Sequence, residues 1–68
     1  MNLPILLTKQ EMLIPHELMP VELRLKYSHY LSFRNYDYCT SAFFAVPPDR
    51  SHYVLADMLD YVMSVTLE

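Results

Sequence analysis

Apolar and polar residues alternate along the chain from residue 21 to residue 33. Apolar side chains hold the odd positions and polar side chains the even ones, with one exception in each set. Successive side chains of a β-strand point to opposite faces, so this period of two predicts a strand with one buried and one solvated face. A helix would instead align a stripe made of Leu23, Tyr27, Tyr30 and Leu31. That stripe omits Val21, Leu25 and Phe33, and the strand is therefore the favoured interpretation.

Residues 38–46 repeat the alternation, with one face made of Tyr38, Thr40, Ala42, Phe44 and Val46. The intervening residues 34–37 contain Asn and Asp, which tolerate turn geometry without glycine. A four-residue turn would pair Phe33 with Tyr38, and a two-residue turn would shift each partner by two positions. Both registers bring the apolar faces together, so we expect an antiparallel hairpin of strands at about 21–33 and 38–46.

The pattern becomes helical after Pro47 and Pro48, which end the second strand. Two adjacent stripes follow, one of Leu55, Leu59, Val62 and Thr66 and one of Val54, Met58, Tyr61 and Val65. This spacing predicts a C-terminal helix at about 50–66. A capping-box pattern at residues 8–11 predicts a short N-terminal helix from Lys9, which Pro15 limits to one or two turns.

Together these elements predict a single small α+β domain over residues 1–68. The short N-terminal helix precedes the hairpin, and the C-terminal helix packs against the apolar face of the hairpin. The alternative is a small all-α domain, in which residues 20–34 form a helix.

The composition indicates that part of the apolar surface is covered by another chain. Hydrophobic residues make up 53% of the chain and charged residues 19%, and the single cysteine excludes an internal disulfide. A domain of this size has a marginal core, so a second copy or a larger protein is expected to cover the surplus. A net charge of −3 argues against a general nucleic-acid binder.

The chain contains no glycine. Phosphate-binding loops, dinucleotide-binding motifs and nucleophile elbows all need glycine, so we expect no nucleotide cofactor. No run of eighteen apolar residues is present, and the first seven residues lack the basic region of a signal peptide. We therefore expect no membrane segment and a cytoplasmic location.

The solvated face of the predicted hairpin combines cations with aromatic rings and is the first candidate binding surface. It consists of Arg24, Lys26, Tyr30, Arg34 and Phe43. Tyr and Arg are favoured anchors of protein interfaces, so we assign these residues to partner binding. Two alternatives remain: residues 3–7 fold over Tyr30 and Phe43, or the face stacks single-stranded nucleic acid.

The second stripe of the C-terminal helix is a candidate for self-association, and it consists of Val54, Met58, Tyr61 and Val65. Its spacing is that of a seam between helices, so we expect a homodimer or docking into a partner groove. The alternative is burial beneath the N-terminal segment.

No catalytic or metal-binding set emerges from the sequence. His16-Glu17 resembles the start of a zinc-protease motif, but Pro20 stands where the second histidine is needed. The hairpin prediction places His29 and Cys39 on opposite faces, which disfavours a nucleophile pair. We therefore expect a protein that is not an enzyme.

The expected function is a non-catalytic interaction module that binds, and inhibits or adapts, a larger host protein. Small acidic chains poor in glycine and cysteine are common among phage and mobile-element accessory proteins, which block a host enzyme or defence complex. The alternatives are a structural subunit of an obligate homo-oligomer and a small nucleic-acid-binding regulator.

Overall fold

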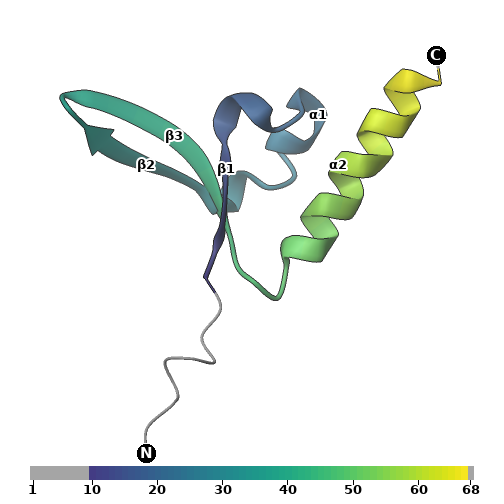
Figure 1. Ribbon diagram of the computed structural model, residues 1–68, viewed down its shortest axis with the longest axis horizontal. Coiled ribbons are helices and arrows are strands. Elements are labelled where there is room, and N and C mark those ends of the chain that lie inside the picture. Colours follow the sequence, from purple (N-terminus) through teal and green to yellow (C-terminus); the bar gives the residue numbers. More distant parts are fainter. Residues whose placement is uncertain (1–9, 68) are drawn as a thin grey trace, which may run out of the picture.

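The computed structural model describes residues 10–67, which form a three-stranded antiparallel sheet, short helical segments and one long helix (Figure 1). The sheet order is β1 (Met12–Pro15), β3 (Cys39–Val46), β2 (Leu31–Tyr36), so strand β3 is central. Helix α2 (Ser51–Thr66) follows the sheet and lies to one side, while the hairpin of β2 and β3 extends to the other. The predicted α+β class is confirmed, and the sheet excludes the all-α alternative.

The hairpin is present, but its turn comes later than predicted. Asp37 and Tyr38 form the turn with φ angles of 48° and 67°, the positive pair that a two-residue type I′ turn requires. Phe33 therefore lies opposite Ala42, and not opposite Tyr38 or a partner two positions from Tyr38, as the predicted registers require. Because these shifts are even, the same side chains still share a face.

The predicted first strand is wrong over residues 21–30, which contain helix α1 (Val21–Arg24) and the 3-10 helix η3 (Ser28–Tyr30). Strand β3 ends before Pro47, and its last pairing with β2 is Leu31 with Phe44. Most of residues 21–30 would therefore have no backbone partner in a longer hairpin. The helical stripe is the one that packs: Tyr27 is buried, and Leu23 and Tyr30 pack against the core.

A strand, β1 (Met12–Pro15), stands where the short N-terminal helix was predicted to continue. The start of that predicted helix lies outside the described residues. A helix of one or two turns is marginal on its own, whereas β1 gains backbone hydrogen bonds along the edge of β3. It pairs Met12 with Val46 and Ile14 with Phe44, which places Ile14 in the core. The 3-10 helix η2 (His16–Leu18) follows directly and contacts β3.

The core is one cluster drawn from β1, β3, α2 and two connecting residues, Met19 and Tyr27; its members are Ile14, Met19, Tyr27, Phe44, Val46 and Val54. Phe44 and Val46 lie on the face of β3 that the helical segments cover, and both are fully buried. The predicted C-terminal helix is confirmed as α2, and Val54 is its buried contribution to the core.

Candidate functional site

A pocket of about 340 Å³ opens between residues 26–30 and the first turns of α2. It is lined by Lys26, Tyr27, Tyr30, Arg50, Tyr53, Ala56 and Asp57. Residues 53, 56 and 57 share one side of α2, because positions three and four apart are neighbours on a helix. The pocket exists because residues 26–30 form a compact turn and η3, which face this side of α2.

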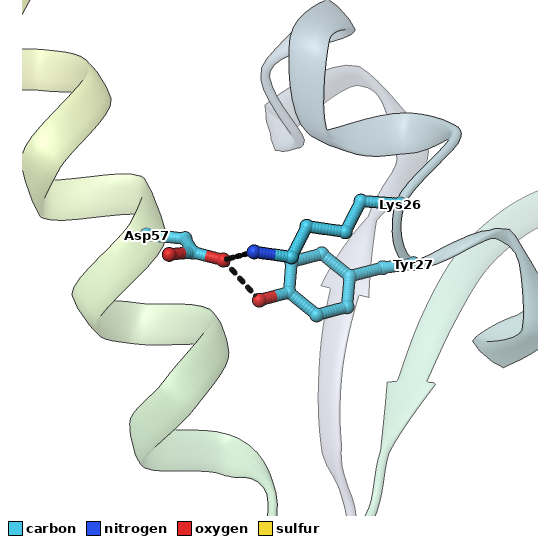
Figure 2. A network of polar contacts seen from close by, with 3 residues as sticks. All are labelled: Lys26, Tyr27 and Asp57. Atoms are coloured by element: carbon cyan, nitrogen blue, oxygen red, sulfur yellow. Dashed lines mark hydrogen bonds and ion pairs between the residues drawn. The ribbon is translucent and has the colours of Figure 1, made fainter.

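Asp57 connects α2 to the segment that follows α1 through two hydrogen bonds (Figure 2). The Lys26 ammonium donates to Asp57 Oδ2 at 2.7 Å, and the Tyr27 hydroxyl donates to the same oxygen. These two hydrogen bonds favour the charged carboxylate and hold the pKa of Asp57 below its ordinary value. Asp57 in turn raises the pKa of Lys26, mainly through their hydrogen bond. At neutral pH Lys26 and Asp57 are both charged. Asp57 is therefore better suited to hold α2 in place than to act as a general base.

Aromatic rings form the walls of the pocket. The rings of Tyr27 and Tyr30 stack with centroids 6.2 Å apart and an angle of 13° between their planes. The Arg50 guanidinium lies 5.8 Å from the centre of the Tyr53 ring, and Lys26 Nζ lies 5.5 Å from that of Tyr27. Burial raises the pKa of the Tyr27 phenol, and its hydrogen bond to Asp57 raises that pKa further. Tyr27 therefore stays neutral and fixed in place at physiological pH.

The predicted partner-binding residues do not form one surface. Lys26 and Tyr30 line the pocket, while Arg24 in α1 donates from Nε to the Met19 carbonyl at 3.0 Å. Arg34 and Phe43 lie on the opposite side of the sheet from Phe44, with the guanidinium 5.4 Å from the ring centre. The prediction that one strand carries all these cations is wrong, because that strand begins only at Leu31.

The predicted self-association stripe is divided by the fold. Val54 is fully buried and Met58 packs against the core, so these two side chains face inward. Tyr61 is half-buried and Val65 is exposed. The neighbouring stripe is the one left uncovered, since Leu55, Leu59 and Val62 remain 51%, 61% and 53% exposed.

Sequence reasoning missed Arg50, Tyr53, Ala56 and Asp57 as members of a site. The available signal was a small residue, Ala56, between an aromatic and an acidic residue on one helix side. That signal becomes specific only when residues 26–30 are helical turns, and the strand prediction placed these residues elsewhere.

The described residues offer little for metal or nucleophilic chemistry. Within residues 10–67, no group of three His, Cys, Asp or Glu side chains is placed to hold a metal ion. His16 stacks on the Phe44 ring with centroids 5.9 Å apart, and Cys39 is an exposed thiol beside the hairpin turn. In the same part of the chain, no helix is both long enough and apolar enough to cross a membrane.

These features define a small α+β domain with a tyrosine-lined pocket and a helix whose outer side is apolar and uncovered. Comparisons of the chain with protein-family models, with curated proteins and with solved structures found no match.

Proposed function

We propose that this chain is a non-catalytic protein-interaction module that binds a larger partner protein and inhibits or adapts it. The uncovered apolar side of α2 carries this proposal. Leu55, Leu59 and Val62 recur at intervals of four and three residues, and each is more than half exposed. An amphipathic helix with anchors at this spacing fits an apolar groove on a partner protein.

The charges of α2 support docking by this side. Asp57 and Asp60 lie on the other side of the helix, and Asp57 is already held by Lys26. The outer stripe therefore presents no charge that would have to be desolvated without a partner. Val54 and Met58 face the core, and the stripe beside them stays uncovered.

A free, exposed thiol at Cys39 supports the proposed cytoplasmic location. Such thiols persist in reducing compartments, whereas secreted small domains pair their cysteines. A host-directed phage or mobile-element protein would act in this compartment.

The second candidate is a structural subunit that associates through the same stripe. An uncharged stripe is self-complementary about a two-fold axis, which favours a homodimer. A nucleic-acid-binding role has less support, because Lys26 is paired with Asp57 and Arg24 is separated from Arg34 in the fold.

Affinity capture of the tagged chain from lysate of its native cell tests the proposal, with Leu59→Glu as the variant. Leu25→Glu is the matched control, because Leu25 is 84% exposed and lies outside α2. We expect the wild-type chain and Leu25→Glu to retain one protein that Leu59→Glu loses, with unchanged circular dichroism. Retention by Leu59→Glu would refute the role of α2, and recovery of only untagged copies of the chain would favour the homodimer.

A further inference from the structure

The pocket beside α2 has a chemistry of its own, distinct from the apolar stripe. We propose that it binds an aromatic ring that carries a carboxylate, either as a free small molecule or as the last residue of a peptide. This inference goes beyond the proposed function and does not depend on it, because it uses residues that the outer stripe does not contain.

The charge of the pocket favours an anion. Its lining contains two cations, Lys26 and Arg50, against one carboxylate, Asp57, in a chain whose net charge is −3. Asp57 is already paired with Lys26, and this is the single ion pair among residues 10–67. Arg50 stacks on Tyr53 and keeps its donors available, and a guanidinium binds a carboxylate through two parallel hydrogen bonds.

The walls of the pocket favour a ring. Tyr27, Tyr30 and Tyr53 supply aromatic faces and edges, and aromatic pairs prefer offset or edge-to-face contacts. Tyr27 is a rigid wall, since it is buried and its hydroxyl is held by Asp57. Ala56 contributes only a methyl group at the α2 side, which leaves room for the ligand.

The size of the pocket limits the ligand. A volume of about 340 Å³ lies at the lower end of the range for ligand pockets, roughly 300–1,000 Å³. One ring system with a short acidic arm fits this space, whereas a dinucleotide does not. The ligand class is therefore an aryl or indolyl carboxylate.

Amide chemical-shift titration with indole-3-acetate tests the assignment on the full chain. Indole-3-acetamide supplies the ring without the charge, and acetate supplies the charge without the ring. We expect saturable shifts at residues 26–30 and 50–57 with indole-3-acetate. Binding should be at least about ten-fold weaker for indole-3-acetamide, which loses the charged hydrogen bonds, and for acetate, which loses the ring contacts. Equal binding of indole-3-acetamide, or no saturable shift at these residues, would overturn the proposal.

Three variants locate the site. Arg50→Gln is expected to weaken indole-3-acetate about ten-fold through the lost charged hydrogen bonds, and Ala56→Leu is expected to abolish binding by filling the pocket. Arg34→Gln removes a cation that also stacks on a ring, Phe43, but lies on the sheet, so it should bind as the wild type does. An equal loss in Arg34→Gln and Arg50→Gln would reduce the effect to net charge and refute the site.

Two further experiments distinguish a peptide end from a free small molecule as the ligand, and the pocket from the apolar stripe of α2 as the binding surface. A tetrapeptide ending in tryptophan and its C-terminal amide are titrated in the same way. Tighter binding of the acid than of indole-3-acetate assigns the pocket to a peptide end, and weaker binding assigns it to a free carboxylate. Leu59→Glu should keep its affinity for indole-3-acetate even when it loses the captured protein, so the two proposals fail separately.

Discussion

Strand β3 and helix α2 are both rich in apolar residues, but they differ in how many of these side chains the fold buries. Phe44 and Val46 on β3 are fully buried, whereas α2 buries only Val54. β3 has a strand on each side and helical segments over one face, so its apolar side chains have neighbours. α2 meets the rest of the described chain along one side of its first half, where Val54, Asp57 and Met58 lie.

The contrast separates the residues that fold this chain from those that are available to bind. An apolar pattern defines a face, but it does not determine how many faces the same chain can cover. A monomer rarely exposes a large contiguous apolar patch unless the patch is functional. The stability of the fold is therefore expected to depend on β3, and binding on α2.

The difference between β3 and α2 is tested most directly by truncating one large side chain in each element. Phe44→Ala removes a fully buried ring, and such a change costs about 3–5 kcal/mol, enough to unfold a small domain. Leu59→Ala removes a side chain that is 61% exposed, so we expect a change within about 0.5 kcal/mol. Thermal unfolding followed by circular dichroism measures both. Similar losses in the two variants would mean that α2 is as much a part of the core as β3.

A second substitution pair compares two valines within α2. Val54 is fully buried and Val62 is 53% exposed, so Val54→Ala and Val62→Ala make the same chemical change in different surroundings. Val54→Ala loses two buried carbon atoms and is expected to cost about 2 kcal/mol. Val62→Ala should be neutral or slightly stabilising, because alanine has the higher helix propensity. Equal denaturation midpoints for the two variants would contradict the observed orientation of α2.

The sequence was sufficient to predict the hairpin and α2, because the hydrophobic period of each segment is that of the element it forms. Residues 31–33 and 38–46 alternate with the correct period, and the two prolines after Val46 end the strand. The failure at residues 21–30 has a physical reason: alternation specifies two faces, but a strand also needs a partner of equal length. β3 is 8 residues long, so the paired strand β2 begins only at Leu31.

The candidate site was less predictable than the fold. Lys26 and Tyr30 were chosen from the sequence, but as neighbours of Arg34 on a strand rather than of Asp57 on a helix. The pocket depends on helical turns at residues 26–30 meeting one side of α2. The contacting positions are about thirty residues apart in the sequence, so local hydrophobic patterns do not predict the contact.

The tip of the hairpin, just before β3 begins, allows packed and unpacked residues to be compared within the hairpin. Tyr38 adopts a φ of 67° and its side chain is fully exposed, so it has backbone strain and no packing. A left-handed conformation costs an L-residue about 1–2 kcal/mol, and the extra flexibility of glycine offsets part of that cost. We therefore expect Tyr38→Gly to stabilise the chain by about 0.5–1 kcal/mol, measured by chemical denaturation. Tyr36→Gly, on the paired strand, should destabilise it, and a gain in that variant would refute a strained turn.

The smallest expected effect concerns the polar latch between α2 and residues 26–27. An exposed ion pair contributes little to stability, so the signature of Asp57→Asn is a change in pH dependence rather than a large loss. The pKa of Asp57 is lowered in the folded chain, so its contribution is present above the unfolded value of about 3.9 and is lost as the pH falls below it. The pKa of Lys26 is raised in the folded chain, so the pH dependence has the opposite sign at the alkaline end. The contribution of Lys26 to the free energy of unfolding is present below about pH 10.4 and is lost as the pH rises through the folded pKa.

Denaturation midpoints measured from about pH 2 to pH 7 check the acid limb. Wild type should lose stability more steeply below pH 4 than Asp57→Asn, because the asparagine cannot be protonated in that range. Asp60→Asn is the matched control, since Asp60 lies one turn further along α2 and forms no ion pair within the described residues. If Asp60→Asn flattened the acid limb as much as Asp57→Asn, the effect would come from the charge of the helix in general. A flattening confined to Asp57→Asn would instead identify the contact with Lys26 and Tyr27 as the polar tie that orients α2, and with it the uncovered stripe on its outer side.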